Sequence, residues 1–269
     1  MRRYLILSAA LLLTARVFAW LPVFVGHRGC AFGVENTAEA YRYGADHFGY
    51  AGLECDVKVT ADGHYIISHD DNTERVGGRL DVNTSTLAEL QAEQYIQKRR
   101  GLTYAGRICT LDEFLQICVE KHVFPIVELK WANGINNNDM SRFAGVVALL
   151  EQYGLTDKAV ILTSMRQSLE YILENYPTLH CQYLMMEMTD EKIDWCIRNG
   201  VEPSCAHTGI TACQVMRCHD AGLKVAGWTV DQQADYERIS KIGVEYITTN
   251  SLSKYQPDIA PVDWNASCR

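Results

Sequence analysis

The sequence has no excess of positive charge, because 25 Lys and Arg stand against 33 Asp and Glu. A formal charge of −8 leaves no basic surface to bind a nucleic-acid backbone by counterion release, so we expect no nucleic-acid partner. Proline is scarce at six residues, and 48% of the residues are hydrophobic. This composition excludes a disordered or fibrous chain and is typical of a globular protein.

Two common cofactor motifs are missing as well. No G-x-G-x-x-G follows a predicted strand, which argues against a doubly wound dinucleotide-binding sheet. The ten cysteines include no C-x-x-C and no pairs at zinc-site intervals. We therefore expect them to be small buried side chains, with one or two disulfides in an oxidising compartment.

The first 19 residues have the pattern of a secretory signal. Arg2 and Arg3 precede an apolar run over residues 4–15, and residues 17–19 (Val-Phe-Ala) offer a small-residue cleavage site. A membrane anchor is the alternative, but the run is short for a span and Arg16 interrupts it. We predict a signal peptide over 1–19, one domain over 20–269, a periplasmic or secreted protein, and no stable membrane insertion after processing.

From residue 23 onward, short apolar runs alternate with segments of helical period, as in repeated strand-helix units on a parallel sheet. Eight strands are predicted, at 23–26, 52–57, 125–129, 158–162, 180–184, 201–205, 224–229 and 245–248. Seven helices are predicted between them, at 37–48, 111–121, 139–153, 166–175, 190–198, 211–221 and 231–242. Eight units in about 250 residues favour an α/β fold, a closed (β/α)8 TIM-type barrel.

One stretch departs from this alternation after the second strand. Residues 60–63 (Thr-Ala-Asp-Gly) indicate a tight turn, and residues 64–68 a short antiparallel strand. The residues that follow are polar and have only weak helical period. We therefore predict a small insertion, about residues 70–109, over one face of the barrel.

Polar and aromatic side chains gather at the predicted C-terminal strand ends, where a TIM-type barrel forms its site. In chain order they are His27, Arg28, Glu54, Asp56, His69, Glu128, Lys130 and Trp228. Side chains alternate along a strand, so Glu54 and Asp56 share one face. With Glu128 from the third strand, we expect three carboxylates to converge on the barrel mouth.

Three converging carboxylates repel one another unless protons, cationic side chains or a bound cation compensate them. Oxygen-only ligands favour one divalent cation, Mg²⁺ or Ca²⁺, over Zn²⁺. Arg28 and Lys130 add positive charge that suits an anionic substrate such as a phosphate ester. His27 and His69 can form an acid/base pair.

Each group taken singly also has a structural interpretation. Glu54 and Asp56 could belong to an ion network with Arg28 or Lys130, and Trp228 could be part of the core. Their common placement at one end of the barrel strands favours a site over these separate explanations.

Eight segments match one known family in order: His27-Arg28-Gly29, Glu35-Asn36-Thr37, Glu54-x-Asp56, Thr60-x-Asp62-Gly63, His69-Asp70, Glu128-x-Lys130, Trp228-Thr229-Val230 and Ile247-Thr248-Thr249-Asn250. From residue 24 to about 250 the chain resembles the glycerophosphodiester phosphodiesterase family. The resemblance implies an enzyme that hydrolyses glycerophosphodiesters to sn-glycerol 3-phosphate and an alcohol with a divalent cation. It also implies the TIM-type barrel with a small insertion after the second strand.

The resemblance also implies a role for each of these residues. Glu54, Asp56 and Glu128 would bind the metal, and His27 and His69 would exchange protons. Arg28 and Lys130 would contact the phosphate, and Trp228 would contact the glycerol or the alcohol. Which histidine is the acid stays open, as does attack by water or by the neighbouring glycerol hydroxyl. The chain departs from the family at residues 75–78 (Arg-Val-Gly-Gly), where an Arg-Thr-Thr type segment is common, and at Asn250, where an Asp is common.

Two other functions are compatible with the same barrel. A phospholipase D-like hydrolase of lysophospholipids would need an exposed apolar rim on the insertion, where aromatic residues are few, chiefly Tyr95 and Tyr104. A non-catalytic phosphodiester-binding protein would have no need of two histidines for proton transfer. The set of residues therefore favours an enzyme acting on a small-molecule glycerophosphodiester.

Overall fold

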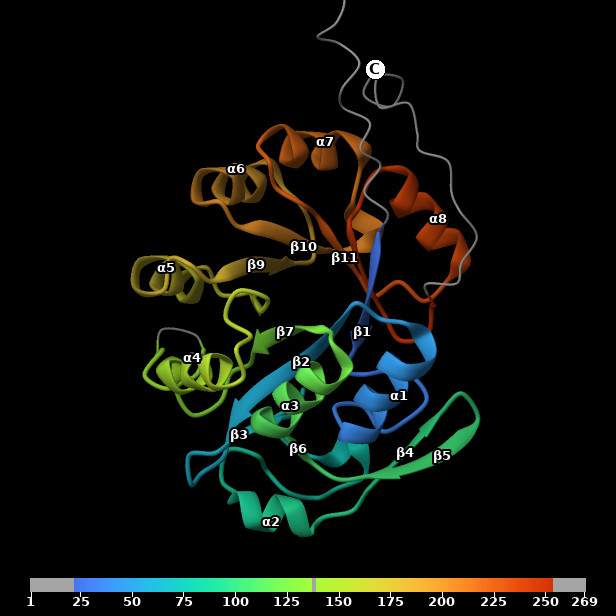
Figure 1. Ribbon diagram of the computed structural model, residues 1–269, viewed down its shortest axis with the longest axis vertical. Helices are drawn as coiled ribbons and strands as arrows, with labels where there is room; N and C mark the ends of the chain where they lie inside the picture. Colours follow the sequence, from blue (N-terminus) through green and yellow to red (C-terminus); the bar gives the residue numbers. More distant parts are fainter. Residues whose placement is uncertain (1–21, 137–138, 254–269) are drawn as a thin grey trace, which may run out of the picture.

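The computed structural model describes residues 22–136 and 139–253, and the predicted signal peptide lies outside these ranges. The barrel is closed, with strands in the order β1-β12-β11-β10-β9-β8-β7-β2 and β2 paired back to β1 (Figure 1). Its eight parallel strands are β1 (Val23–His27), β2 (Gly52–Val59), β7 (Phe124–Leu129), β8 (Val160–Thr163), β9 (His180–Met185), β10 (Glu202–Ala206), β11 (Ala226–Trp228) and β12 (Tyr246–Thr249). The predicted TIM-type barrel is confirmed.

Helices surround the barrel, and all seven predicted positions hold one. They are α1 (Ala38–Phe48), α3 (Leu111–Lys121), α4 (Phe143–Gln152), α5 (Arg166–Asn175), α6 (Asp190–Asn199), α7 (Ala212–Asp220) and α8 (Gln233–Lys241), with a short 3₁₀ turn η2 (His207–Gly209) before α7. Four of these helices have a threonine N-cap. The side chains of Thr37, Thr110, Thr189 and Thr211 each accept a hydrogen bond from a backbone N–H of the first turn.

The side chains of strand β2 alternate between the core around the barrel and the barrel interior. All eight of its residues are buried. Leu53, Cys55 and Val57 belong to the hydrophobic core between the strands and the helices. The alternating residues Glu54 and Asp56 therefore face the other way, into the barrel.

The predicted antiparallel excursion is present after β2. Strand β3 (Tyr65–Ile67) pairs antiparallel with β2, and β6 (Cys109–Thr110) pairs antiparallel with β3. Between them lie η1 (Glu74–Val76), α2 (Leu87–Ala92) and a two-stranded hairpin of β4 (Tyr95–Arg99) and β5 (Leu102–Gly106). The sequence did not predict this hairpin, whose turn at Arg100-Gly101 has positive φ at both residues.

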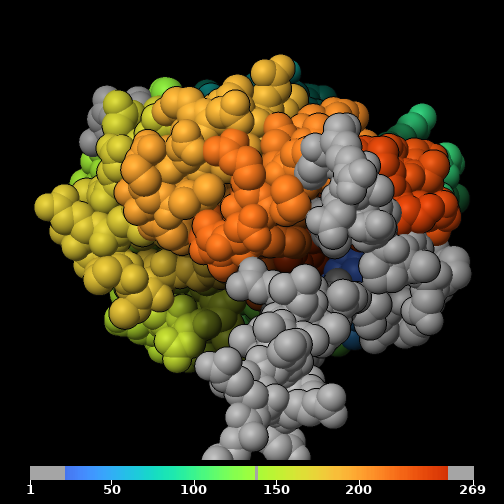
Figure 2. Space-filling view, turned by 90° about the horizontal axis from the view of Figure 1, so that it is seen from above, coloured from blue at the N-terminus to red at the C-terminus, as the bar shows by residue number. Residues whose placement is uncertain are grey.

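The insertion lies below α1 and α3 in the ribbon view, and α6 and α7 lie at the opposite end (Figure 1). Seen from the α7 side, the surface is formed mainly by the second half of the chain, coloured yellow to red (Figure 2). The excursion from β2 is therefore an addition to one side of the barrel. It lies beside the first strands, whose ends carry most of the predicted site.

The described cysteines are mostly core residues, as expected. Eight of them are free and buried, and Cys213 is disulfide-bonded. No helix within the described ranges is long and apolar enough to cross a membrane.

Candidate active site

Alternate residues of the barrel strands face its interior. Val25, Ile126 and Ala226 pack together in one apolar cluster inside the barrel. Two residues further along the same strands come His27, Glu128 and Trp228. Because the side-chain period of a strand is two, these three side chains stand on the same interior face, one layer nearer the C-terminal mouth.

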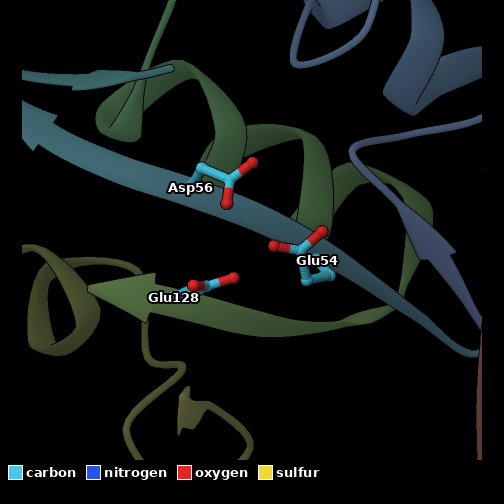
Figure 3. A group of neighbouring side chains, drawn as sticks. All are labelled: Glu54, Asp56 and Glu128. Atoms are coloured by element: carbon cyan, nitrogen blue, oxygen red, sulfur yellow. The ribbon is translucent and has the colours of Figure 1, made fainter. Parts of the chain in front are cut away.

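The three predicted carboxylates meet at this mouth. Strand register places Asp56 opposite Glu128 on the neighbouring strand, and Glu54 opposite His27. Figure 3 shows the side chains of Glu54 and Asp56 on β2 and of Glu128 on β7 pointing toward one another. One oxygen from each lies within 4.8 Å of the others. A single ion can therefore contact all three.

The three carboxylates repel one another when they are ionised, and their pKa values reflect this repulsion. Burial, followed by the nearby Asp56 and Glu128 carboxylates, raises the pKa of Glu54 well above its usual value. Burial and Asp56 likewise raise the pKa of Glu128. Among the described residues, Oε1 of Glu54 and Oδ1 of Asp56 are buried and have no hydrogen-bond partner. Two such oxygens beside a third carboxylate form a ligand set suited to a hard divalent cation.

Two cationic side chains flank the cluster. Nζ of Lys130 lies 2.5 Å from Oε1 of Glu128 and 3.1 Å from Oδ1 of Asp56, the second without hydrogen-bond geometry. Nε of Arg28 lies 3.2 Å from Oδ2 of Asp56. Burial alone would raise the pKa of Asp56, but these two cations hold it well below its usual range. Asp56 is therefore the carboxylate that stays ionised, as the charged centre of the site.

Arg28 is held by a tight loop at the end of β1. The residue has φ +52°, Gly29 follows at φ +92°, and a Cβ on Gly29 would meet the backbone carbon of Ala40 at 2.8 Å. In this conformation the backbone N–H of Arg28 donates to Glu54 Oε2 at 3.0 Å, and its Nη1 donates to Glu35 Oε1 at 2.9 Å. The His-Arg-Gly segment therefore folds back onto the carboxylates.

Both predicted histidines face the site, and each has a partner at Nδ1. Nδ1 of His27 lies 3.1 Å from Oδ1 of Asn250, and Nδ1 of His69 lies 2.6 Å from Oδ1 of Asp70. Burial, then Arg28, lowers the pKa of His27 to about 4. Burial also lowers the pKa of His69. With Nδ1 engaged, Nε2 is the nitrogen of each ring that is left for a ligand.

His69 reaches the site because of the antiparallel excursion. The backbone N–H of Ser68, just after β3, donates to the carbonyl oxygen of Asp56 at 2.8 Å. The next residue therefore lies beside the carboxylate cluster. Arg75 donates to both oxygens of Asp70 at 2.6 and 3.0 Å, which fixes the carboxylate behind His69.

Trp228 closes the interior layer at the end of β11. Its indole Nε1 is buried and has no hydrogen-bond partner among the described residues. A buried unpaired donor carries a cost unless a ligand accepts from it. The structure thus places all eight predicted residues at one end of the barrel.

Several residues of the site were missed or were given another role. Asn36 directly precedes Thr37, the N-cap of α1, and donates to Asp56 Oδ2 at 2.8 Å. Glu35, which pairs with Arg28, belongs to the Glu35-Asn36-Thr37 segment that carries the family resemblance, and it could have been assigned from that segment. Asn250 is more distant in sequence, and only its departure from the family pattern marked it.

A cavity of about 500 Å³ lies at the other end of the barrel, at the N-terminal ends of the strands. Its walls include Ala51, Phe124, Val160, His180 and Tyr246. It contains none of the eight predicted residues. Because barrel enzymes carry their chemistry at the C-terminal face, we place the site at the carboxylate cluster instead.

Comparison with known proteins identifies the family of the chain. The family model of the Glycerophosphoryl diester phosphodiesterase family matches residues 27–254. A glycerophosphodiester phosphodiesterase of Caldanaerobacter subterraneus subsp. tengcongensis is 28% identical over 84% of this chain and 93% of its own length. Glycerophosphodiester phosphodiesterase 1 of Homo sapiens is 24% identical, covering 94% of this chain and 90% of its own.

Solved structures share the fold at low sequence identity. A phosphodiesterase of Oleispira antarctica in complex with sn-glycerol-3-phosphate superposes with a TM-score of 0.73 at 20% identity, covering 87% of this chain and 94% of that one. A glycerophosphodiester phosphodiesterase of Parabacteroides distasonis gives 0.70 at 20% identity, over 86% and 93%. The family match spans most of the chain, and we conclude that the protein is a phosphoric diester hydrolase belonging to the glycerophosphoryl diester phosphodiesterase family.

Proposed function

We propose that the chain hydrolyses glycerophosphodiesters to sn-glycerol 3-phosphate and an alcohol, with one divalent cation held by Glu54, Asp56 and Glu128. The observation that carries the proposal is the convergence of these three buried carboxylates within 4.8 Å, two of which have an oxygen without a hydrogen-bond partner among the described residues. Oxygen donors of this kind fit Mg²⁺ or Ca²⁺. The product complex of the Oleispira antarctica relative supports sn-glycerol 3-phosphate as the product.

The two cations of the site are suited to bind the phosphate. Arg28 and Lys130 contact different oxygens of Asp56, Oδ2 at 3.2 Å and Oδ1 at 3.1 Å. When bound, a divalent cation would draw negative charge from the non-bridging phosphate oxygens. Arg28 and Lys130 would add charge-assisted hydrogen bonds to the same group.

The partners behind the two histidines differ in charge, and this difference supports an assignment of roles. Burial lowers the pKa of His69, but the hydrogen bond to the Asp70 carboxylate opposes this and favours the protonated ring, so His69 is suited to give a proton to the leaving alkoxide. Asn250 is a neutral amide, so His27 is suited to take a proton from the attacking hydroxyl through Nε2. Cleavage leaves His27 protonated and His69 deprotonated. Opening of a cyclic phosphate by water would reverse both transfers, whereas after direct attack by water the two rings would exchange these protons with solvent.

The attacking group distinguishes two routes to the same product. If water attacks, sn-glycerol 3-phosphate forms directly. If the neighbouring glycerol hydroxyl attacks first, a cyclic glycerol phosphate forms and is then opened by water. Cyclic glycerol phosphate in a quenched reaction would identify the second route.

The lysophospholipid alternative has less support. Ile96 and Leu102 are the exposed large apolar residues of the insertion. Their pairing partners are Ala105 and Arg99, so the two side chains lie on opposite faces of the hairpin. They therefore do not form one continuous apolar rim. Export remains a proposal from the signal-like first 19 residues, and N-terminal sequencing of the mature protein tests it.

A coupled assay for released glycerol 3-phosphate, run over a panel of glycerophosphodiesters and lysophospholipids, tests the function. We expect turnover of the water-soluble diesters, with the preferred alcohol identified by the panel. Turnover of lysophospholipids alone would favour the phospholipase D-like alternative. Tight binding of every diester without product would favour the non-catalytic binding protein.

A further inference from the structure

The β4–β5 hairpin presents one polar face to the barrel. Within the described part of the chain its strands pair only with each other, so there the hairpin has no backbone ladder to the barrel sheet. Residues alternate along β4, with Ile96 and Lys98 exposed and Gln97 and Arg99 half-buried. Gln97 and Arg99 therefore share the face that is turned toward the site.

Arg99 reaches the segment that follows β1 and the residue behind His27. Its Nη1 donates to the carbonyl oxygens of Cys30 at 2.8 Å and Gly33 at 3.4 Å. Its Nη2 donates to Oδ1 of Asn250 at 3.2 Å. The same Oδ1 atom lies 3.1 Å from Nδ1 of His27.

The orientation of the Asn250 amide is fixed from two sides. Asp231 accepts from the backbone N–H and from Nδ2 of Asn250, both at 2.7 Å. A carboxylate can only accept and a guanidinium can only donate, so the amide nitrogen faces Asp231 and the amide oxygen faces Arg99. His27 must then donate from Nδ1, which leaves the lone pair of the neutral ring on Nε2.

Gln97 reaches the residue behind Arg28. It accepts from the backbone N–H of Glu35 at 3.0 Å and donates to Glu35 Oε2 at 3.2 Å. The other oxygen of Glu35 accepts from Arg28 Nη1 at 2.9 Å. Alternate residues of one short strand thus support two different functional side chains.

We propose that β4 of the insertion is a positioning strand: Arg99, together with Asp231, fixes the ring tautomer of His27 through Asn250, and Gln97 fixes Arg28 through Glu35. The consequence for turnover rests on the proposed function, whereas the consequence for the histidine tautomer does not. Neither residue is placed in contact with substrate. The insertion thereby becomes part of the catalytic apparatus without supplying a reacting group.

The two substitutions should act on different kinetic constants. Arg99→Ala misplaces the proton acceptor and should lower kcat by roughly tenfold with KM little changed, the size expected for a charged hydrogen bond. Gln97→Ala loosens a phosphate contact made in both ground and transition states, so it should raise KM by roughly threefold to tenfold with kcat little changed. Lys98→Ala, which removes the same charge from the exposed face of the same strand, is the matched control.

The decisive readout is the ring of His27 in a long-range ¹H–¹⁵N spectrum of the full chain at pH 8, assigned by its loss in His27→Gln. We expect the Nδ1–H tautomer in the wild type and in Lys98→Ala, a mixture in Arg99→Ala, and return of the Nδ1–H form in Arg99→Lys, which keeps one donor. An unchanged tautomer in a folded Arg99→Ala protein would overturn the proposal, even if kcat falls. A wild-type protein without diester turnover but with this tautomer response would overturn the proposed function and leave the positioning role standing.

Discussion

Nζ of Lys130 lies 2.5 Å from Oε1 of Glu128, two residues earlier in the same strand end. The ammonium group also lies 3.1 Å from Asp56, so it is a counter-ion to two of the three carboxylates. All three side chains are more than four-fifths buried, with side-chain exposures of 16%, 13% and 1%. Lys130 is therefore a main source of compensation for the clustered negative charge.

Lys130→Met should destabilise the chelated protein, because it keeps the apolar stem and leaves two buried carboxylates without their shared cation. We expect a loss of about 3 kcal/mol in the free energy of unfolding. Saturating Mg²⁺ or Ca²⁺ should restore most of this loss. Urea denaturation with and without chelator measures both. Lys121→Met, which breaks exposed ion pairs with Asp46 and Glu120, should cost less than about 1 kcal/mol. Equal losses for the two variants would show that the Lys130 pairs are ordinary surface contacts.

Glu54→Gln should stabilise the chelated protein, and the gain should grow with pH. Burial and the neighbouring carboxylates raise the pKa of Glu54 in the folded state above its usual 4.5. Above pH 4.5 the folded protein therefore holds a proton that the unfolded chain has released, so stability falls as the pH rises. Substitution by a neutral isostere removes this dependence.

Thermal unfolding in chelator at pH 5 and pH 8 tests this sign. The Tm difference between Glu54→Gln and wild type should be larger at pH 8, by about 3 °C. With saturating cation the order should reverse, since the variant loses a ligand. A variant that is less stable than the wild type in chelator at pH 8 would contradict the strained-cluster interpretation.

Substrates with different leaving alcohols should distinguish the catalytic roles of the two histidines. His69→Ala should lower kcat by about 10²–10⁴ for substrates with an aliphatic alcohol, which needs a proton as it departs. With p-nitrophenol, which leaves as a stable anion, the same variant should lose only about tenfold or less. His27→Ala should be impaired with both substrates, because the attacking group still has to lose a proton. If the substrate with the p-nitrophenol leaving group instead restores kcat in His27→Ala and not in His69→Ala, the assignment of the two histidines is reversed.

Trp228→Phe tests whether the unpaired indole donor serves the substrate. The variant keeps an aromatic ring and removes Nε1, which is buried without a partner in the structure. If substrate accepts a hydrogen bond there, KM should rise by roughly fivefold with no loss of stability, because a net hydrogen bond contributes about 1 kcal/mol. If KM is unchanged and the variant is more stable, the substrate does not accept a hydrogen bond from Nε1, and the buried donor only destabilises the fold.

The barrel and most of the site could be predicted because they depend on local patterns. Apolar runs of strand length and threonine caps such as Thr37 mark the alternating elements. The functional residues stand at strand ends, where chain order alone assigns them to one face. Glu54 and Asp56 required only the period of a strand to be placed side by side.

The supporting residues could not be predicted because they depend on tertiary contacts across long separations. Asn250 lies 223 residues from His27 in sequence, and Arg99 lies 151 residues from Asn250. The hairpin that carries Arg99 turns at Arg-Gly rather than at Asn-Gly or Asp-Gly, so the usual turn signal was missing. The role of Asn36 likewise depends on a tertiary contact, because its partner Asp56 lies 20 residues away on β2.

Cation dependence of glycerol 3-phosphate release tests the central claim most directly. Chelator-treated protein should release no product from a glycerophosphodiester, and added Mg²⁺ or Ca²⁺ should restore release in the wild type but not in Glu54→Gln. Full activity after chelation, or equal restoration of the Glu54→Gln variant, would contradict a shared cation at Glu54, Asp56 and Glu128.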